Sequence, residues 1–410
     1  MSSAFEVLKE RGFVSQVTDE EAVARAFDEG TVTCYIGFDP TARSLHVGHL
    51  VQIMALAHVQ RGGHRPIALV GGGTAMVSDP SGKDELRPML ATEAIDQNIT
   101  RIKTQLERYL DFDGERALMV NNADWLRSLN YVTFLREIGE HFSVNRMLTA
   151  EAYKLRMEKG LTFLEFNYQI LQAYDFLMLF RNYGCTIQLG GDDQWGNIVA
   201  GVDLIRRKER AAAQAVTTPL LTTADGSKMG KTLGGALWLD PDMTSPYDYY
   251  QYWINVDDRD VAGLLARFTF LPMEQIRELS ALEGEKIRDA KTVLASEATK
   301  ITHGEEEAAQ AQRGARSVFG GAWDGGDHVP TVKIGRDRLE AGINVVDLFL
   351  EAELGKSKSE VRRLIQQGGA SVNGEKVSAI ERVLDTGDLD DEGVLLLRAG
   401  KKRFQRVKTG

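Results

Sequence analysis

The feature that most constrains the fold is an alternation of short apolar runs with helical stretches over residues 1–225. Four runs have the composition of buried strands, at 31–38, 66–73, 116–122 and 185–191. Each ends at or just before a glycine, asparagine or aspartate, and helical stretches separate them. Strands that alternate with helices in this way form parallel sheets, so the sequence predicts an α/β fold.

Polar, glycine-bearing segments follow these strands. They are HVGH at 46–49, GGGTAMVSDPSGK at 71–83, VNNADW at 120–125 and GGDDQWGN at 190–197. In open α/β sheets, ligands bind beyond the carboxyl ends of the strands. We therefore expect the four segments to lie at one edge of the sheet and to form a single site.

The HVGH segment opens a helix directly after the first strand. The free N–H groups and the dipole of a helix N-terminus favour an anion. His46 and His49 are three residues apart, so they share a helix face and can donate hydrogen bonds to phosphate oxygens. Gly48 leaves space where a base or ribose would approach. Taken alone, the motif could equally be a helix cap with two surface histidines.

A second motif, GSKMGKT at 226–232, lies far along the chain. Lys228 and Lys231 flank a glycine and give a short loop two flexible cations. Such a loop can close on a pyrophosphate and neutralise charge that develops there. Taken alone, it could be a solvated turn. The two motifs together predict an ATP site.

The helical stretch 163–177 carries a polar stripe on an otherwise apolar surface. Tyr168, Gln172 and Asp175 are spaced four and three residues apart, so they lie on one face. Burying unpaired polar groups costs about 1–3 kcal/mol each. The stripe therefore predicts a bound molecule with an amine and a hydroxyl, the alternative being a partly exposed helix face.

Composition and charge indicate where the protein works and what it meets. The net charge is −10, with 15 Lys+Arg and 13 Asp+Glu in residues 331–410, so that part carries +2 and residues 1–330 carry −12. This balance suits an acidic body with a C-terminal part that meets a polyanion, the alternative being a chance difference in composition. We expect a cytoplasmic protein, because there are two cysteines, no signal-peptide pattern and no apolar run near the ~20 residues of a membrane span.

The rest of the chain falls into further segments. We expect domains at 1–225 and 226–320, a glycine-rich linker at 321–342 and a C-terminal domain at 343–410. The second domain is predicted to be helical from its apolar periodicity. In the last domain, Ser357 and Glu360 form a capping-box pattern before a helix, and Asn373–Gly374 predicts a hairpin turn.

These segments together resemble the bacterial tyrosyl-tRNA synthetase family, a class I aminoacyl-tRNA synthetase, and the resemblance runs through almost the whole chain. It is carried by YIGFDPTARSLHVGHL, EFNYQILQAYDF, LGGDDQWGNI, KMGKT, SPYDYYQYWIN and SKSEVRRLIQQGGASVNGEKV. The resemblance implies a Rossmann-like parallel-sheet catalytic domain, an α-helical domain and a small α+β RNA-binding domain of the ribosomal-protein type. It also implies that tyrosine reacts with ATP to form tyrosyl-adenylate, which is then transferred to tRNA(Tyr).

The resemblance assigns roles to residues of this sequence. Tyrosine binding falls to Tyr35, Asp79, Tyr168, Gln172, Asp175 and Gln194. ATP binding falls to Gly37, Asp39, His46, Gly48, His49, Gly191, Asp193 and Lys231. The catalytic groups are His46, His49, Lys83, Arg87, Lys228, Lys231 and Thr232. In the tail, RNA contacts are expected at Lys356, Lys358, Arg362, Arg363, Lys401, Lys402 and Arg403.

The resemblance further implies ATP as a substrate accompanied by Mg²⁺ with no dedicated protein metal site, no membrane association, and a homodimer. Two alternatives stay open from the sequence. One is another enzyme with a His-x-Gly-His nucleotide site, such as a tryptophanyl-tRNA synthetase or a small-molecule nucleotidylyltransferase. The other is an RNA-binding protein that keeps the fold without the activity. The Tyr168/Gln172/Asp175 stripe and the C-terminal module disfavour the first alternative. The retained histidines, loop lysines and Asp175 disfavour the second.

Overall fold

The structure is a computed structural model. It describes residues 3–77, 79–81, 90–158, 160–226, 229–232, 235–319, 331–390, 393–400 and 403–409. The predicted site residues Lys83, Arg87, Lys228, Lys401 and Lys402 lie outside these ranges. The chain divides into two compact units, one made of Met1–Thr244 with Val256–Ala290 and the other of Ser245–Asn255 with Lys291–Gly410.

The first unit is built on a five-stranded sheet. Its strands are β1 (Thr33–Phe38), β2 (Arg65–Val70), β3 (Leu118–Asn121), β4 (Ile187–Gly191) and β5 (Gln214–Thr218). They lie in the order β3-β2-β1-β4-β5, and every neighbouring pair is parallel. The predicted α/β fold with a parallel sheet is thereby confirmed. In this order β1 and β4 are central neighbours, so the loops that follow them lie side by side.

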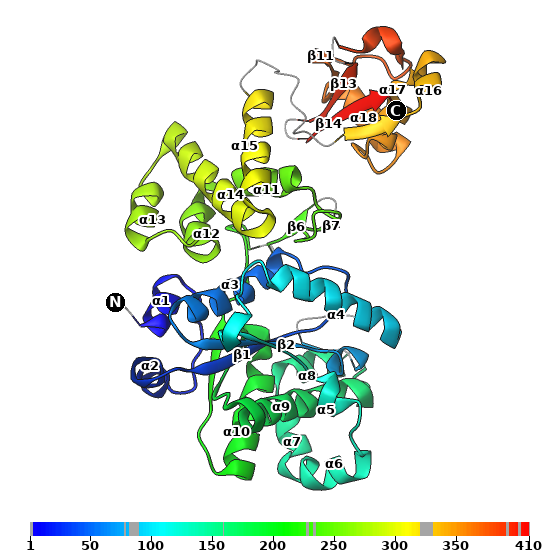
Figure 1. Ribbon diagram of the computed structural model, residues 1–410. Helices are drawn as coiled ribbons and strands as arrows, with labels where there is room; N and C mark the ends of the chain where they lie inside the picture. The colour runs from blue at the N-terminus through cyan, green and yellow to red at the C-terminus, as the bar shows by residue number, and fades with distance from the viewer. Residues whose placement is uncertain are drawn as a thin grey trace. The chain divides into compact units, whose positions relative to one another are not determined.

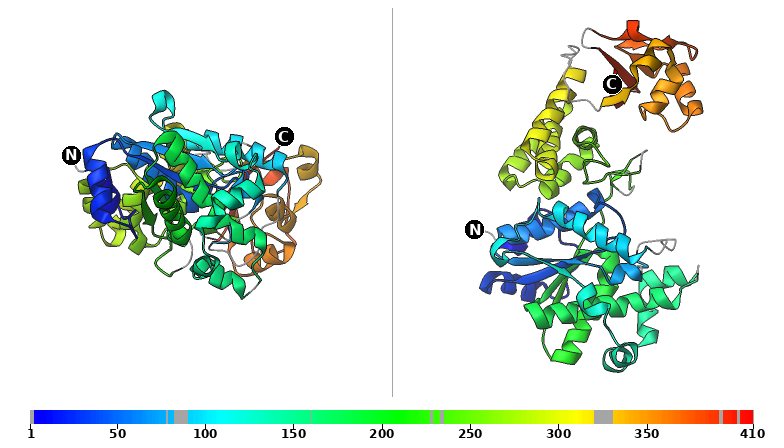
Figure 2. Two further views of the ribbon diagram at one scale, coloured as in Figure 1. Left: turned by 90° about the horizontal axis from the view of Figure 1, so that it is seen from below. Right: turned by 45° about the vertical axis from the view of Figure 1, so that its right-hand side comes forward.

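Helices cover both faces of this sheet (Figure 1). Helix α3 (Val47–Arg61) lies on one face, and α9 (Phe163–Tyr183) and α10 (Trp195–Glu209) lie on the other, as the right-hand view of Figure 2 also shows. A capping box between Thr162 and Glu165 begins α9 and Gly184, at φ +64°, ends it. The packing of α9 on β1 brings the polar stripe against the sheet.

Shorter elements complete the first unit. Its other helices are α1 (Ala4–Glu10), α2 (Glu20–Glu29), α4 (Thr92–Leu106), α5 (Ala123–Leu126), α6 (Tyr131–Glu137), α7 (Val144–Met147), α8 (Glu151–Met157), α12 (Val261–Phe268) and α13 (Met273–Ser280). The small strands β6 (Lys231–Thr232) and β7 (Gly235–Ala236) form a separate antiparallel pair. This pair lies at the second motif.

The second unit holds a helical part and a small α+β part. The helices are α11 (Pro246–Ile254), α14 (Ile287–His303) and α15 (Glu305–Phe319), with α14 beginning in the first unit. After them come β8 (Thr331–Ile334), α16 (Arg336–Glu340), β9 (Ile343–Asn344), α17 (Val345–Glu351), α18 (Lys358–Gln366), β10 (Ala370–Val372), β11 (Glu375–Lys376), β12 (Val383–Leu384), β13 (Val394–Ala399) and β14 (Arg403–Thr409). The helical part and the α+β part both have the secondary structure that was predicted for them from the sequence.

The C-terminal α+β part has its own sheet in the order β11-β10-β13-β14-β8. Asn373 (φ +50°) and Gly374 (φ +83°) form the predicted hairpin turn between β10 and β11. The range 321–342 was expected to be a linker, but it contains strand β8 and helix α16. Because β8 pairs with β14, this strand is part of the C-terminal sheet. The domain boundaries as a whole stay a prediction.

Candidate active site

Backbone hydrogen bonds join the two motifs that the sequence singles out. His46 and Trp238 form an isolated antiparallel bridge, and the Val47 N–H donates to the Leu237 carbonyl oxygen at 2.9 Å. The Leu237 N–H in turn donates to the Gly230 carbonyl oxygen at 2.8 Å. Gly230 has φ +83°, a conformation that favours glycine. The backbone of the second motif therefore lies beside the start of α3, although the two motifs are far apart in the sequence.

The histidines organise the N-terminus of α3. His46 is the N-cap residue, and its Nδ1 accepts from the Gly48 N–H at 3.0 Å. His49 Nδ1 accepts from the His46 N–H at 3.2 Å, and the two ring centroids are 4.0 Å apart. A Cβ added to Gly48 would lie 2.7 Å from the His46 ring, so the glycine is required by this cap. His46 thus precedes the helix and does not lie on its face, but the two rings are neighbours as expected.

Tyr35 and Asp175 form the most buried end of the site. The Tyr35 side chain is 1% exposed, and its hydroxyl has no hydrogen-bond partner among the described residues. Burial and the nearby Asp175 charge raise the pKa of Tyr35 well above its usual value. Asp175, 2% exposed, accepts hydrogen bonds from Asn122 Nδ2 and Trp125 Nε1, each at 2.8 Å. Burial raises the pKa of Asp175 to about 7, against the opposing effect of these two bonds.

Tyr168 and Asp39 meet in the middle of the site. The Tyr168 hydroxyl donates to Asp39 Oδ2 at 3.1 Å, and the Thr74 hydroxyl donates to Asp39 Oδ1 at 2.8 Å. Burial, followed by the charge of Asp39, raises the pKa of Tyr168 well above its usual value. Asn122 Nδ2 also donates to Thr74 Oγ1 at 3.0 Å, which links this cluster to Asp175. The carboxylates of Asp39 and Asp175 are therefore parts of one network.

A third cluster contains Asp79, Gln172 and Gln194. Gln194 Nε2 donates to Asp79 Oδ2 at 2.8 Å. Asn197 Nδ2 donates to Oε1 of both Gln172 and Gln194 at 3.2 Å. It also lies 3.3 Å from the Ser81 hydroxyl oxygen. The sequence motif GGDDQWGN contains Asn197 three residues after Gln194, but spacing alone did not single it out.

Two of the predicted ATP-binding glycines differ in their surroundings: the backbone is open at Gly37 and crowded at Gly191. Gly37 on β1 is exposed, and nothing lies within 4 Å of a Cβ added there. At Gly191, the end of β4, an added Cβ would meet Asp193 Oδ1 at 2.6 Å and Gln52 Nε2 at 3.4 Å. Asp193 and Gln52 therefore lie next to the strand end. Gln52 is a further polar group of this edge that the sequence did not assign.

Comparisons with known proteins give the same family over almost the whole chain. The family described as "tRNA synthetases class I (W and Y)" matches residues 28–320, and "Tyrosine--tRNA ligase SYY-like C-terminal domain" matches 323–407. A tyrosine–tRNA ligase of Clostridium tetani is 56% identical over 99% of each chain, and one of Caldanaerobacter subterraneus is 54% identical over 99% of each chain.

The chain belongs to the tyrosine–tRNA ligase family. It is similar to a C-terminally truncated Aspergillus nidulans mitochondrial tyrosyl-tRNA synthetase, with a TM-score of 0.71 and 32% identity over 78% of this chain and 95% of that one. The Archaeoglobus fulgidus tyrosyl-tRNA synthetase, at 18% identity and a TM-score of 0.57, shares the fold. The alternatives of a tryptophanyl-tRNA synthetase and a nucleotidylyltransferase are set aside by the tyrosine-type relatives.

Membership of this family leaves the individual residue roles as predictions. The structure brings together the tyrosine- and ATP-binding candidates that it describes on β1, the α3 N-terminus, the 71–81 loop, α9 and the end of β4. Lys83, Arg87 and Lys228 lie outside the described residues, and only the backbone of Lys231 and Thr232 is described, in β6. The pyrophosphate-binding cations therefore stay a prediction from the sequence.

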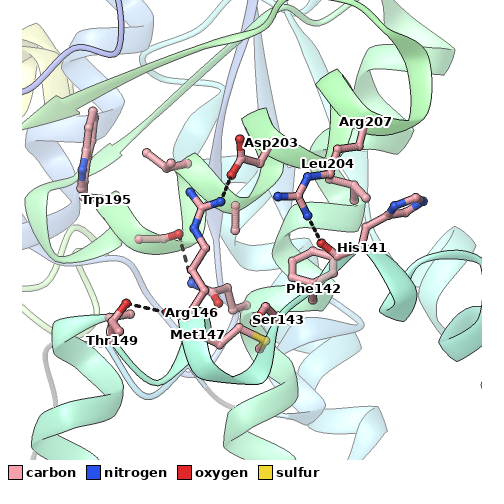
Figure 3. Close-up of a pocket in the computed structure, with 15 residues that line it drawn as sticks. His141, Phe142, Ser143, Arg146, Met147, Thr149, Trp195, Asp203, Leu204 and Arg207 are labelled. Atoms are coloured by element: carbon pink, nitrogen blue, oxygen red, sulfur yellow. Dashed lines mark hydrogen bonds and ion pairs between the residues drawn. The ribbon is translucent and has the colours of Figure 1, made fainter.

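A separate pocket of about 210 Å³ lies between residues 141–150 and helix α10 (Figure 3). Arg146 forms an ion pair with Asp203, and Arg207 donates to the His141 carbonyl oxygen. None of the predicted tyrosine- or ATP-binding residues lines this pocket. This pocket is therefore distinct from the predicted amino-acid site.

The predicted RNA-binding residues that the structure describes are exposed. They are Lys356, Lys358, Arg362, Arg363 and Arg403. On α18, Val361 and Ile365 are buried while the two arginines between them face solvent. Lys358 Nζ lies 2.6 Å from Asp347 Oδ1, so its charge is partly compensated. The exposed arginines of α18 are thus stronger candidates for phosphate contact than Lys358.

Proposed function

We propose that this chain activates L-tyrosine with ATP to form tyrosyl-adenylate and pyrophosphate, and then transfers the tyrosyl group to the 3′ end of tRNA(Tyr). The observation that carries the amino-acid assignment is the buried Tyr35 hydroxyl, which has no partner among the described residues and is close to the Asp175 carboxylate. A buried polar group left in this state is costly. A phenolic hydroxyl from the substrate would accept from Tyr35 and donate to Asp175.

The same pair explains rejection of phenylalanine. Phenylalanine would fill the apolar space but leave the Tyr35 hydroxyl without a partner, and no substrate hydroxyl would donate to Asp175. Tyrosyl-tRNA synthetase is the established example of such discrimination, about 10⁵-fold without editing, so this magnitude belongs to the enzyme type and is not deduced from this chain. What this structure contributes to the argument for discrimination is the buried, polar pair of Tyr35 and Asp175.

The opposite end of the substrate is expected at the second and third clusters. Asp79 and Asp39 supply negative charge, and the Tyr168 hydroxyl and Gln172 supply further hydrogen-bonding groups. These groups suit an α-ammonium, while the Gln194 amide suits the carboxylate or the α-phosphate. We assign tyrosine binding to Asp79, Tyr168, Gln172 and Gln194 together with the Tyr35–Asp175 pair.

We assign the ATP site to the N-terminus of α3 and the neighbouring strand ends. Helix N–H groups and two histidines favour phosphate, and the open space at Gly37 suits close approach of a nucleotide. ATP binding is proposed at Gly37, Asp39, His46, Gly48, His49, Gly191, Asp193 and Lys231. Mg²⁺ would arrive as part of the Mg–ATP substrate. Among the described residues, no group of three or more His, Cys, Asp or Glu has a metal-holding arrangement.

The chemistry needs positioning more than proton transfer. The tyrosine carboxylate is already ionised at neutral pH, so it attacks the α-phosphorus without a general base. In-line positioning can lower the barrier by about 7–11 kcal/mol. Charge that develops on the pyrophosphate would be neutralised by His46, His49 and the loop residues Lys83, Arg87, Lys228, Lys231 and Thr232.

The experiment that tests this function is ATP–pyrophosphate exchange without tRNA, with each common amino acid supplied singly. Exchange with tyrosine, and not with phenylalanine or tryptophan, is expected. Exchange with tryptophan would keep the reaction but overturn the Tyr35–Asp175 assignment. No exchange with any amino acid would favour an RNA-binding protein that keeps the fold without the activity.

We also propose a homodimer, supported by apolar exposure on the first unit. Large apolar side chains are exposed between α6 and the start of α9, at Tyr131, Val132, Leu135, Val144, Met157, Phe163 and Leu164. Exposed apolar surface of this kind marks interaction sites in soluble proteins. We place the protein in the cytoplasm with its tRNA substrate. Within the described parts of the chain, no helix has the length and apolar character to cross a bilayer.

A further inference from the structure

The side chain of Asn197 connects three parts of the site. It lies in the first turn of α10 and is 6% exposed. Its Nδ2 is 3.2 Å from Gln172 Oε1 on α9, 3.2 Å from Gln194 Oε1 before α10, and 3.3 Å from Ser81 Oγ beside Asp79. One buried amide group therefore contacts both glutamines assigned to the substrate. An amide nitrogen has only hydrogens to offer, so both glutamines must present their oxygens to it.

For Gln194, this contact and the Asp79 carboxylate, which can only accept, together set which way the side-chain amide faces. The oxygen and nitrogen of a glutamine amide have nearly the same shape, so hydrogen bonds decide its orientation. Gln194 Oε1 accepts from Asn197, and Gln194 Nε2 donates to Asp79 Oδ2 at 2.8 Å. With the amide reversed, its oxygen would face the Asp79 carboxylate, and its nitrogen would face the Asn197 nitrogen. Neither hydrogen bond could then form.

Gln172 is constrained from the same side. Its Oε1 faces Asn197, and an amide oxygen has a second lone pair that can accept from another donor such as an ammonium. Tyr168 and Asp175 lie on the same stripe of α9. The Asn197 contact therefore fixes Gln172 relative to α10, and with it the amide oxygen that would meet the amino group.

We propose that Asn197 is a positioning residue that sets the orientation of both Gln172 and Gln194 for the amino and carboxylate groups of the amino-acid substrate. The proposal rests on the proposed function, since it assumes that these glutamines bind that substrate. A carboxylate at the same place would have the same shape but could only accept. Gln172 would have to turn its amide around to donate, Gln194 would lose the donor to its oxygen while its nitrogen stays with Asp79, and a charge would be added close to Asp79.

Asn197→Asp tests this reversal, and Asn197→Leu removes the donor without adding charge. In pyrophosphate exchange with the full chain, Asn197→Asp is expected to raise the KM for tyrosine by about tenfold or more, with the KM for ATP within about twofold. Asn197→Leu should raise the tyrosine KM by a smaller factor. Thermal unfolding of each variant is measured alongside.

Gln60→Glu is the matched control. It makes the same amide-to-acid change in α3, where Gln60 Nε2 donates to the Asp111 carbonyl oxygen at 2.6 Å, away from both glutamines. It should lower the unfolding temperature and leave both KM values unchanged. An equal rise in the KM for tyrosine and for ATP in Asn197→Asp, or failure of both Asn197 variants to fold, would show a merely structural role and overturn the proposal.

A double-mutant cycle separates this proposal from the function beneath it. If Asn197 acts through the glutamines, Asn197→Leu, which adds no charge, should have little further effect on the tyrosine KM in a Gln172→Ala/Gln194→Ala background. Full additivity would overturn the proposal while leaving the substrate assignment intact. If Gln172→Ala and Gln194→Ala leave the tyrosine KM unchanged in an enzyme that exchanges with tyrosine, the assignment of the glutamines fails, and the proposal fails with it.

Discussion

Asp175 titrates in an accessible pH range, and this makes its role testable. Burial is the main cause of its pKa of about 7, and the bonds from Asn122 and Trp125 act in the opposite direction. A phenol donates a stronger hydrogen bond to an ionised carboxylate than to a neutral one. Tyrosine should therefore bind more tightly as the pH rises through the pKa of Asp175. With a pKa of about 7 we expect binding roughly eightfold weaker at pH 6 than at pH 7.5.

The measurement is the Kd of tyrosine by equilibrium dialysis across this range. ATP binding, which does not involve Asp175, should not follow the same curve. Asp175→Asn should bind tyrosine weakly at every pH and show no such dependence. A tyrosine Kd that is flat in the unmodified protein would contradict the assignment of the phenol to Asp175.

Removing the Tyr35 hydroxyl should have opposite effects on stability and on binding. The hydroxyl is buried with no partner among the described residues, so Tyr35→Phe removes a costly group from the free protein. The unfolding temperature should stay the same or rise. The KM for tyrosine should increase about two- to tenfold, the worth of one neutral hydrogen bond, and discrimination against phenylalanine should fall. A loss of stability with unchanged tyrosine KM would mean that the hydroxyl has a structural partner.

Individual residues also mark the limit of what the sequence predicts. The spacing of Tyr168, Gln172 and Asp175 predicted a stripe turned inward, and Tyr168 and Asp175 are indeed buried, because helical periodicity determines which residues share a face. The contact between Asn197 and Gln172 joins residues 25 apart, and that between Asn197 and Ser81 joins residues 116 apart. Such contacts depend on how α9 and α10 pack together, which no local pattern specifies.

At the scale of an element, the α3 N-terminus combines a helix cap with a predicted phosphate site. His46→Asn keeps an acceptor at the N-cap, where asparagine is favoured, so the free energy of unfolding should change by less than about 0.5 kcal/mol. His46→Ala should destabilise the protein by about 1 kcal/mol. Both variants lack the imidazole and should lower the rate of pyrophosphate exchange, since His46 is assigned to the developing charge.

Chemical denaturation and exchange kinetics on the same two variants separate these roles. Equal losses of activity with unequal losses of stability are expected. Full activity in His46→Asn would mean that the imidazole serves only to cap α3.

Four strands of the main sheet and their parallel arrangement were predicted, whereas β5 and the order of the strands were not. The runs 31–38, 66–73, 116–122 and 185–191 coincide closely with β1 to β4, because buried strands concentrate apolar and β-branched residues. The sheet order and the bridge between His46 and Trp238 were not predicted. That bridge depends on a return of the chain after the second motif, and pairings between distant segments carry no signal in a single sequence.

For the whole molecule, the exposed apolar side chains between α6 and α9 predict a change of assembly on mutation. Phe163 is 69% exposed, and a charge at this position would be costly in an apolar interface but harmless on a solvated surface. Phe163→Asp should therefore shift the protein from dimer to monomer in sedimentation equilibrium, with an unfolding temperature that depends less on concentration. Arg25→Asp, on the exposed side of α2, is the control and should leave the dimer intact. A Phe163→Asp protein that stays dimeric would place the interface elsewhere.

The last prediction concerns where the substrate-binding and RNA-binding residues lie along the chain. Every described residue assigned to tyrosine or ATP lies in the first compact unit, whereas the exposed Arg362, Arg363 and Arg403 lie near the C-terminus. Deleting residues 331–410 should therefore leave pyrophosphate exchange intact and weaken charging of tRNA(Tyr). Removing one phosphate-binding cation should make the logarithm of tRNA affinity less steep against the logarithm of salt concentration by about one. Arg362→Ala/Arg363→Ala in the full chain should thus reduce the slope by about two, with exchange unchanged. Equal charging by the truncated and full chains at limiting tRNA would show that the C-terminal part does not contribute to tRNA binding. The two arginines would then belong to a solvated helix face.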